Sequence, residues 1–473
     1  MTCPPSASLI RTLKNLLGTK GYSADPDTMA PWLTDWRGKY HGTAAALLSP
    51  ETTEEVAAIV RLCGEARVAL VPQGGNSGMV GGATPDASGD QFLLSLRRMN
   101  RIRHIDREAR FAVAEAGVVL EHFHNAVLDH GFRFPLTLGG KGSATIGGLV
   151  STNAGGTQVL RHGTMRALLA GIEAVLPDGS IFDGLAPLKK DNRGYDLRHL
   201  LCGAEGTLGV VTAACLHLVP IAARVTAWAG VESPDAALLL LRRLDATIGR
   251  ELEGFELIPH ACLDAVLRHI PQTRAPLATA QPWYVLLELA GESDAALNEE
   301  LEAQLAAALD AGLIRDVVIA KNDSESDAFW RLRDSISEAE RAEGPALQHD
   351  VSVPVEQMPA FIAENPRRLA RTFPGTRALS FGHLGDGNVH HHVQPPTGID
   401  GAEWLAEHGE AVSRLVYSHV LELGGSISAE HGIGQMKRDI LAELDSPARL
   451  AALRAVKTGL DPAGIFNPGK LIG

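Results

Sequence analysis

The stretch Pro72–Gly82 reads PQGGNSGMVGG, with five glycines in eleven residues. It follows the apolar run Val68–Val71, which predicts a short buried strand. Two further glycine-rich stretches come later, Leu138–Gly156 (LGGKGSATIGGLVSTNAGG) and Gly203–Gly209 (GAEGTLG). Glycine lets backbone N–H groups approach a ligand closely, and successive N–H groups form concave anion sites. The three loops together predict a site for a long ligand with a pyrophosphate; tight turns in an all-β region are the alternative.

Several nucleotide-binding classes are disfavoured. The chain lacks a GxxxxGK[ST] loop and a strand–GxGxxG–helix opening, so neither a P-loop nucleotidase nor a Rossmann fold is expected. Its 473 residues include 43 Lys and Arg against 56 Asp and Glu, a formal net charge of −13. This balance predicts no nucleic-acid partner, because phosphate binding needs a basic face. Five cysteines without a CxxC pair, and no apolar run of about 18 residues, predict a cytoplasmic protein with no integral membrane segment.

The spacing of apolar residues changes near residue 220. Before it, short strands, turns and glycine loops predominate, after a helical start at Leu9–Leu17. From Val225 onward, apolar strands alternate with long Ala/Leu/Glu helices, which predicts an α+β domain with an antiparallel sheet. The expected strands are Ala44–Leu48, Val68–Val71, Thr226–Val231, Trp283–Leu289 and Val317–Ile319, and the expected helices are Glu51–Ala66, Pro234–Ile248, Asp294–Ala311, Asp327–Ala342 and Glu403–Leu423.

Four strings, in order, carry a resemblance to a known superfamily: PQGGNSGMVGG, PLTLGGKGSATIGGLVSTNAGG, RHGTMRALLAGIEAVLPDG and GAEGTLGVVT. They resemble the FAD-binding domain of the vanillyl-alcohol oxidase / p-cresol methylhydroxylase (PCMH-type) superfamily. The resemblance implies that the first loop wraps the FAD pyrophosphate and that the other two line the ring and the adenosine. The first loop contains Asn76 and no His, which implies non-covalent FAD. The residues assigned to FAD in this way are Pro72, Gln73, Gly74, Gly75, Asn76, Ser77, Gly78, Ser143, Thr145, Gly148, Asn153, Val210, Asn467 and Lys470.

A histidine and glutamate constellation lies in the second half. His383 and His390 are separated by a Gly-Asp-Gly turn, so the two rings can converge across a hairpin, and Glu430 and His431 follow later. Two imidazoles and one carboxylate, with an open position for substrate, form the ligand set of a catalytic zinc site. Hydrogen-bonded histidines of the core or surface are the alternative.

A narrower resemblance rests on the strings GHLGDGNVH and SAEHGIG and on the terminal NPGK. They resemble the D-2-hydroxyacid dehydrogenases: D-2-hydroxyglutarate dehydrogenase, FAD-linked D-lactate dehydrogenase and the glycolate oxidase flavin subunit. The resemblance implies that a divalent metal, usually zinc, is bound by His383, His390 and Glu430. It also implies that His431 is the general base and that Asn388 touches the substrate. Arg333 would grip the substrate carboxylate, as a planar guanidinium can.

Two positions depart from the pattern of D-2-hydroxyglutarate dehydrogenases. Ser337, expected to share a helix face with Arg333, stands where Thr is typical, and Gln348 stands where Lys is typical. Gln348 lacks the charge that would pair with a distal carboxylate. A D-2-hydroxyacid such as D-lactate or D-malate is therefore an alternative to D-2-hydroxyglutarate.

These observations predict FAD- and metal-dependent oxidation of a D-2-hydroxyacid to the 2-oxoacid, with hydride passing to flavin N5. The expected fold is α+β: a PCMH-type FAD-binding domain (1–220), a substrate (cap) domain with the metal site and an antiparallel sheet (221–440), and a helical tail that returns to the FAD domain (441–473). Electrons would pass to electron-transfer flavoprotein or a quinone rather than NAD, and a homodimer is one expected assembly. The whole prediction requires the hairpin and the acidic segment to meet over the flavin ring.

A transferase of the alkylglycerone-phosphate synthase type, on the same FAD scaffold, is the main alternative, and Glu430 favours the dehydrogenase. A flavin-free zinc hydrolase is another alternative, but that function would give the three glycine loops no ligand. An oxidase that uses O₂ directly is a further alternative.

Overall fold

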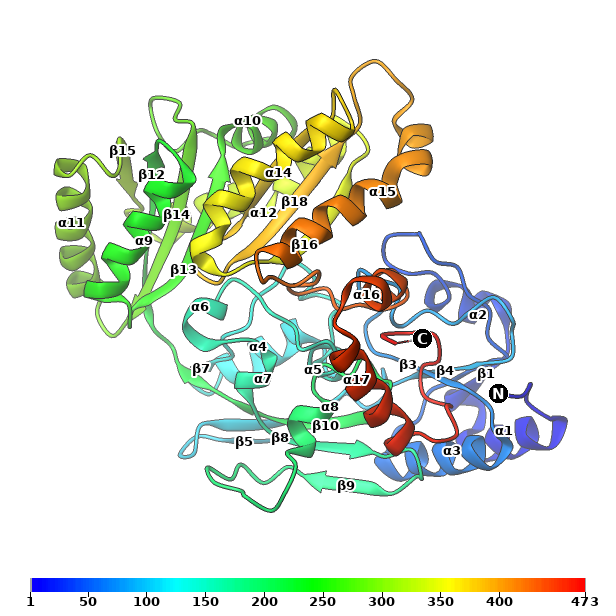
Figure 1. Cartoon of the computed structure of the whole chain (residues 1–473). Coiled ribbons are helices and arrows are strands. Elements are labelled where there is room, and N and C mark those ends of the chain that lie inside the picture. The colour runs from blue at the N-terminus through cyan, green and yellow to red at the C-terminus, as the bar shows by residue number, and fades with distance from the viewer. Residues whose placement is uncertain (1, 473) are drawn as a thin grey trace. The chain divides into compact units, whose positions relative to one another are not determined.

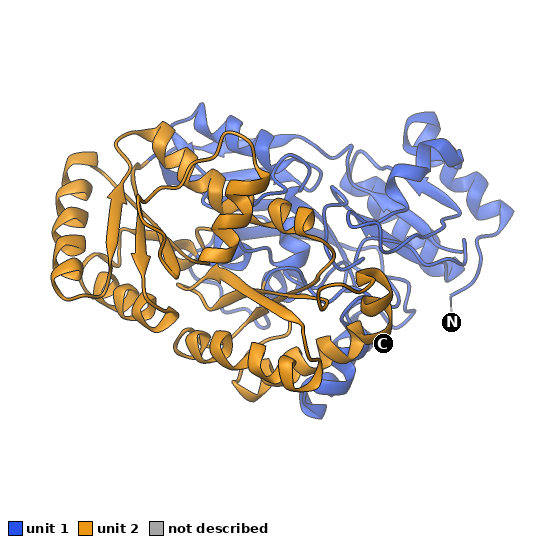
Figure 2. Ribbon diagram, turned by 90° about the horizontal axis from the view of Figure 1, so that it is seen from above, with its two compact units in different colours: residues 1–156, 163–221, 430–473 blue, residues 157–162, 222–429 orange. Residues whose placement is uncertain are grey.

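The computed structural model describes residues 2–472, which form two compact units (Figure 2). Among the described residues, unit 1 comprises 2–156, 163–221 and 430–472, and unit 2 comprises 157–162 and 222–429. Within residues 2–472, no helix combines the length and the apolar character needed to span a membrane.

Unit 1 contains two main sheets (Figure 1). In the first, β2, β4 and β3 run parallel and β1 joins antiparallel to β2, in the order β1-β2-β4-β3. The second is antiparallel, in the order β5-β6-β10-β8-β9, and a small ladder pairs β11 with β7. Their bounds are β1 Tyr22–Ser23, β2 Ala46–Leu48, β3 Leu70–Gln73, β4 Phe92–Ser95, β5 Ile102–Asp106, β6 Phe111–Glu115, β7 Phe132–Arg133, β8 Leu169–Val175, β9 Ile181–Gly184, β10 Val210–His217 and β11 Val219–Pro220.

The helices of unit 1 bury one apolar face each. The helix α1 carries buried Leu9, Leu13 and Leu17, and α3 begins at the N-cap Thr52, whose side chain accepts from the N–H of Glu55. Both helices contribute to the core that covers the parallel strands. The helices of this unit are α1 Ala7–Gly21, α2 Pro26–Met29, α3 Thr53–Ala66, α4 Leu120–Leu128, α5 Ile146–Thr152, α7 Met165–Leu168, α8 Leu197–Leu201, α16 Arg438–Leu444 and α17 Pro447–Leu460, with a 3₁₀ turn at Ala30–Trp32.

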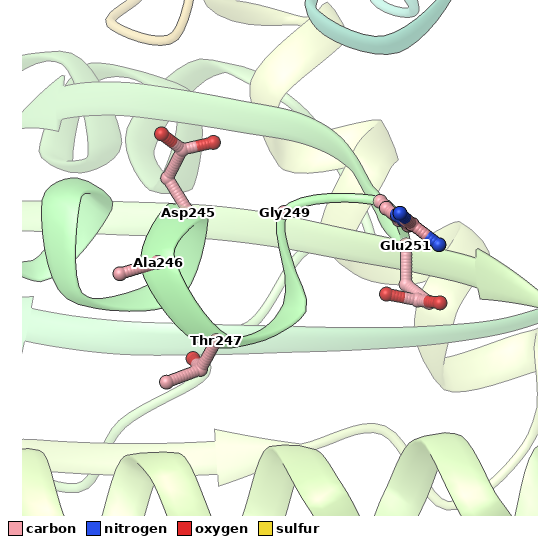
Figure 3. Close-up of a pocket in the computed structure, with 6 residues that line it drawn as sticks. Asp245, Ala246, Thr247, Gly249 and Glu251 are labelled. Carbon is pink, nitrogen blue, oxygen red and sulfur yellow. The ribbon is translucent and has the colours of Figure 1, made fainter.

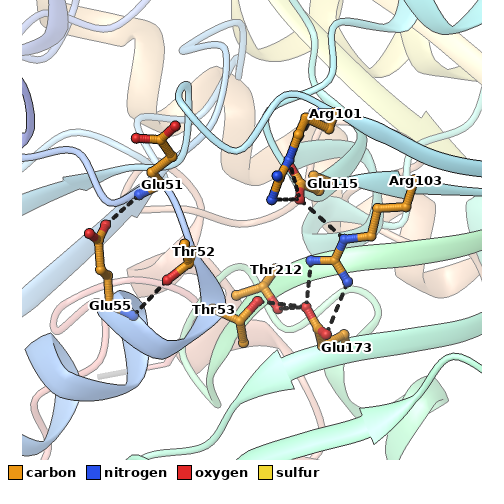
Figure 4. A network of polar contacts seen from close by, with 9 residues as sticks. All are labelled: Glu51, Thr52, Thr53, Glu55, Arg101, Arg103, Glu115, Glu173 and Thr212. Atoms are coloured by element: carbon orange, nitrogen blue, oxygen red, sulfur yellow. Dashed lines mark hydrogen bonds and ion pairs between the residues drawn. The ribbon is translucent and has the colours of Figure 1, made fainter.

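A buried polar network ties α3 to the antiparallel sheet of unit 1 (Figure 4). The carboxylate of Glu173 accepts hydrogen bonds from Thr53 Oγ1 at 2.7 Å and Thr212 Oγ1 at 2.8 Å. Arg103 donates two bonds of 3.0 Å to the same carboxylate and one of 3.1 Å to Glu115. Because each carboxylate is paired, the network stabilises the junction without leaving an unpaired buried charge.

Unit 2 is built on one seven-stranded sheet in the order β15-β12-β14-β13-β17-β18-β16, in which every neighbouring pair is antiparallel. Its core includes Trp228, Tyr284 and Phe381 from the strands, against residues of α10, α12 and α13. The strands are β12 Ala223–Val231, β13 Leu252–Pro259, β14 Trp283–Gly291, β15 Asp316–Ile319, β16 Leu347–Ser352, β17 Arg377–His383 and β18 Asn388–Gln394. The helices are α6 Val159–His162, α9 Pro234–Ile248, α10 His260–His269, α11 Asp294–Asp310, α12 Asp323–Asp334, α13 Ile336–Glu343, α14 Met358–Thr372 and α15 Gly401–Glu422, with a 3₁₀ turn at Val355–Gln357.

The α+β class and the antiparallel second sheet are confirmed. The helix expected over Pro234–Ile248 has those bounds, and the other expected elements differ by a few residues at their ends, with one exception. The single helix expected over Asp327–Ala342 is wrong, because the chain forms α12 and α13 with a turn at Ser335. Asp334 and Ser335 both have low helix propensity, which favours an interruption there.

The chain returns to unit 1 earlier than the expected boundary at residue 440. Unit 1 resumes at Glu430, because the segment that follows is bonded to other parts of unit 1. Glu205 accepts from the backbone of Ile433 and Gly434, and Gln435 donates to the carbonyl of Gly81. The short helix α6 belongs to unit 2, where Arg161 donates to Glu253 on β13 at 3.1 Å.

Candidate active site

The three glycine loops converge within unit 1. A Cβ on Gly74 would overlap Thr145 Oγ1, and a Cβ on Gly75 would overlap the carbonyl oxygen of Ser143, so the first loop lies directly on the second. Gly206, with φ of +69°, places the third loop near Pro72, because its Cβ would lie 3.2 Å from Cγ of that proline. These close approaches explain why glycine is needed at these positions.

The C-terminal segment joins the same cluster of loops. Asn467 Nδ2 donates to the carbonyl of Gly82 at 2.8 Å and to that of Glu205 at 2.7 Å, so it bridges the first and third loops. Lys470 is buried, and this burial lowers the pKa of its ammonium to about 8. Four segments distant in sequence therefore form one glycine-rich surface in unit 1.

This surface fits a long anionic cofactor. Thr145 Oγ1 and Asn467 Oδ1 are buried and have no hydrogen-bond partner within residues 2–472. Gly78 has open space where a side chain would be, so the loop also presents bare backbone. Unsatisfied polar atoms and exposed loop backbone beside a buried ammonium suit the pyrophosphate and polar groups of FAD.

Some residues assigned to FAD by resemblance serve the protein itself. Gln73 ends β3, and its buried Nε2 donates to the carbonyls of Trp32 and Ala83 at 2.9 Å. Asn76 has φ of +52° and donates to the carbonyl of Thr34 at 2.8 Å. The amide nitrogens of these two side chains therefore fix the loop to the rest of unit 1, and their contact with FAD stays a prediction.

Further assigned residues lie in the second glycine loop and directly after the third. Asn153 is the C-cap of α5, and its Oδ1 accepts from Thr164 Oγ1 at 3.0 Å and from the N–H of Arg166 at 2.9 Å. Val210 is a buried core residue at the start of β10, whereas Ser143 is exposed. Neither the amide oxygen of Asn153 nor the side chain of Val210 is presented to a ligand, so their assignment to FAD stays a prediction.

The hairpin expected around His383 and His390 is present in unit 2. His383 is the last residue of β17, His390 is the third of β18, and the turn between them includes Gly387 with φ of +79°. The two imidazole centroids lie 5.6 Å apart at an interplanar angle of 75°. The turn therefore brings the two rings together, as the Gly-Asp-Gly sequence predicts.

Glu430 completes the group, since one ligand atom from each of His383, His390 and Glu430 lies within 4.8 Å of the others. Glu430 is joined directly to Ala429, the last residue of unit 2, and is half-buried like His390. Burial lowers the pKa of His390 well below its ordinary value, despite the nearby Asp350 carboxylate, which favours the neutral imidazole that ligates metals. This donor set suits a divalent ion such as Zn²⁺.

A buried carboxylate lies behind each imidazole. Glu256 on β13 is paired in register with His383, and Glu256 Oε1 accepts a hydrogen bond from Nδ1 of that histidine. On β16, Asp350 Oδ1 lies 3.8 Å from His390 Nδ1. Carboxylates in such positions fix the orientation and tautomer of a metal-binding imidazole. The sequence reasoning missed both, although a Glu within the apolar run of β13 was a usable signal.

The predicted substrate residues have different environments. Arg333 is nearly buried, with Nε 2.8 Å from Glu256 Oε2 and Nη2 3.2 Å from His383 Nε2. Asn388 Nδ2 donates to Asp350 Oδ1 and to the carbonyl of Val351, both at 3.0 Å, so it supports the hairpin. The structure thus brings Arg333 and Asn388 to the two imidazoles. Their contact with a substrate stays a prediction.

Ser337, Gln348 and His431 are the other predicted substrate and catalytic residues. Ser337 lies on α13 and is exposed, whereas Arg333 lies on α12, and Ser335 separates the two helices, so the shared face of Arg333 and Ser337 stays a prediction. Gln348 is half-buried on β16, paired in register with His392. His431 is half-buried and directly follows Glu430.

The surface hollow shown in Figure 3 lies elsewhere in unit 2. It is lined by Asp245, Ala246, Thr247, Gly249, Arg250 and Glu251, around the end of α9. None of these residues belongs to the imidazole–carboxylate cluster, and the hollow is not part of the candidate site.

Comparison with known proteins supports this description. A FAD binding domain matches residues 44–184, and the C-terminal domain of FAD linked oxidases matches residues 221–471. The chain is 37% identical to the mitochondrial D-2-hydroxyglutarate dehydrogenase of Arabidopsis thaliana, over 97% of this chain and 80% of that protein. It is 35% identical to D-2-hydroxyglutarate dehydrogenase of Xanthomonas citri pv. viticola, over 98% of this chain and 96% of that one.

Solved structures are similar in fold. Substrate-bound p-cresol methylhydroxylase matches with a TM-score of 0.75 at 15% identity, over 98% of this chain and 96% of that one. An alkyldihydroxyacetonephosphate synthase matches with a TM-score of 0.74, also at 15% identity, over 99% and 87%. The fold alone therefore does not separate dehydrogenase from synthase, whereas the sequence relatives favour the dehydrogenase. The chain belongs to the FAD-linked oxidase family and is an FAD-dependent oxidoreductase.

Proposed function

We propose that the chain oxidises a D-2-hydroxyacid to the 2-oxoacid with FAD and a divalent metal, and that D-2-hydroxyglutarate is the first candidate substrate. The cluster of His383, His390 and Glu430, with ligand atoms within 4.8 Å of one another, carries the proposal. Three protein ligands leave positions on the ion for a substrate hydroxyl and carboxylate. The relatives named D-2-hydroxyglutarate dehydrogenase, at 35% and 37% identity, support the substrate class.

The residues have separate roles in this proposal. When bound, FAD accepts a hydride and the divalent ion lowers the pKa of a coordinated hydroxyl. His431 takes the hydroxyl proton as general base, the role that imidazole side chains fill most often. Arg333 binds the substrate carboxylate, and Glu256 keeps the guanidinium oriented through the 2.8 Å bond to Nε.

The substrate side chain is the least constrained part of the proposal. Gln348 offers an amide rather than a charge, so a distal carboxylate would gain a hydrogen bond but no ion pair. D-lactate and D-malate therefore stand beside D-2-hydroxyglutarate. We further propose electron-transfer flavoprotein or a quinone as the acceptor, because the sequence predicts no nicotinamide site, and a homodimer as the assembly.

Anaerobic flavin bleaching tests the proposal. The purified protein, with its 450 nm flavin band, is mixed with D-2-hydroxyglutarate, D-lactate, D-malate and their L-enantiomers. We expect bleaching by a D-enantiomer only, its loss after EDTA treatment and its return with Zn²⁺. His383→Ala and Glu430→Gln should lose metal and bleaching while retaining flavin.

Three outcomes would contradict the proposal. A yellow protein bleached by no hydroxyacid would favour the synthase reaction. Full bleaching after metal removal would exclude a metal role, and loss of flavin in His383→Ala would mean that the cluster supports the cofactor instead.

A further inference from the structure

The turn after Glu430 and His431 is held by a buried carboxylate that has no role in the proposed chemistry. Glu205, in the third glycine loop, accepts hydrogen bonds from the N–H of Ile433 at 2.8 Å and from the N–H of Gly434 at 2.7 Å. Each carboxylate oxygen takes one of these two successive backbone donors. This arrangement is an anion-binding nest in which the anion belongs to the protein.

Glu205 is itself fixed on all sides. Its backbone N–H donates to the carbonyl of Ser151 at 2.7 Å, and its own carbonyl accepts from Asn467 Nδ2 at 2.7 Å. It has φ of +51°, a strained value for a residue with a side chain. The residue is buried, at 9% exposure, so water does not replace these contacts. The loop therefore presents the carboxylate at one defined point.

The turn closes tightly around this carboxylate. Gly432 has φ of +81°, and a Cβ there would lie 2.9 Å from Glu205 Oε1. Beyond the turn, the N–H groups of Gln435 and Met436 donate to the carbonyl of Val80 at 3.1 and 3.2 Å. The backbone after His431 is thus fixed between the third glycine loop and the first, and a rigid backbone limits where the imidazole can lie.

We infer that Glu205 is a positioning residue, which sets the place of His431 for proton transfer by holding the 432–434 turn. The inference rests on the proposed role of His431 as general base. Glu205 touches neither proton nor substrate in this scheme.

Glu205→Gln tests the inference with little change in side-chain volume. It replaces one acceptor oxygen with an NH₂ group that faces a backbone N–H. Glu173→Gln is the matched control, since Glu173 lies in the same unit and bonds to Thr53, Thr212 and Arg103 instead. Hydrogen exchange of peptides that span 432–435 reads out the turn directly. We expect exchange about tenfold faster, or more, in Glu205→Gln and unchanged in Glu173→Gln, because only the first substitution removes a carboxylate that accepts from the backbone of this turn.

Catalysis is read out as the rate of anaerobic flavin reduction in a single turnover. We expect Glu205→Gln to lower it by about tenfold to a hundredfold, the loss typical of a misplaced catalytic group, with flavin content unchanged. In a His431→Asn background the same substitution should cause no further loss, because residues that act through one another are not additive.

The outcomes separate the inference from the proposed function. Unchanged exchange in Glu205→Gln would overturn the inference, whatever the reaction. Faster exchange together with an equal loss of the flavin-reduction rate, with His431 present and in the His431→Asn background, would show a general structural role. That result would also overturn the inference. A wild-type flavin reduced by no hydroxyacid would refute the proposed function and, with it, the catalytic role of Glu205, while exchange would still report whether Glu205 holds the turn.

Discussion

Replacing Glu256 with Gln removes one negative charge from a fully buried site with two donors. The side chain of Glu256 is 1% exposed, while those of Arg333 and His383 are 13% and 8% exposed. One oxygen accepts from His383 Nδ1 and the other from Arg333 Nε, so a Gln amide can serve only one of them. The guanidinium would remain buried beside a neutral group.

Two magnitudes follow from this geometry. Breaking a buried ion pair by removing one partner costs about 3–5 kcal/mol of stability. Loss of a carboxylate that orients a metal-binding imidazole weakens metal affinity about 10- to 100-fold. The pKa of Glu256 lies at about 2, since Arg333 and His383 outweigh the opposing effect of burial, so the charge is present at neutral pH.

The assay combines thermal or urea unfolding with metal competition against a chelator of known affinity. Glu253→Gln is the matched control, because Glu253 is equally buried on the same strand and pairs with Arg161 at 3.1 Å. It should lose comparable stability while keeping wild-type metal affinity. Unchanged metal affinity in Glu256→Gln, or an equal loss in Glu253→Gln, would refute the assignment of Glu256 to His383.

Three further predictions concern FAD, pH and specificity. Gly75→Ala should abolish flavin retention at 450 nm, because its Cβ would overlap the Ser143 carbonyl, whereas Gly78→Ala has open space and should retain flavin. Burial lowers the pKa of Lys470 from 10.5 to about 8, so between these values the unfolded chain holds a proton that the folded chain has released. The free energy of unfolding should therefore gain a rising contribution from pH 8 to 10.5, measured by urea unfolding, and Lys470→Met should lack it. Gln348→Lys should raise the kcat/KM ratio of D-2-hydroxyglutarate to D-lactate by about tenfold, as expected for one new charge-assisted bond, and an unchanged ratio would place the distal carboxylate elsewhere.

The sequence alone determined the local features of this protein. The glycine loops, the strand before Gly74 and the turn between His383 and His390 depend on residues that are close in sequence. Their backbone preferences can therefore be predicted from the sequence. Helix starts such as Thr52 can be predicted for the same reason, since the N-cap side chain accepts from the backbone N–H three residues later.

The partners of the buried polar side chains, by contrast, depend on the tertiary structure. Glu256 lies 127 residues before His383, and Glu205 lies 228 residues before Ile433, yet each pair is hydrogen-bonded. No periodicity links such positions, because strand order and loop packing set them, and these depend on burial of the whole core. A buried carboxylate is stable only beside donors, so the fold that buries these groups also selects their partners.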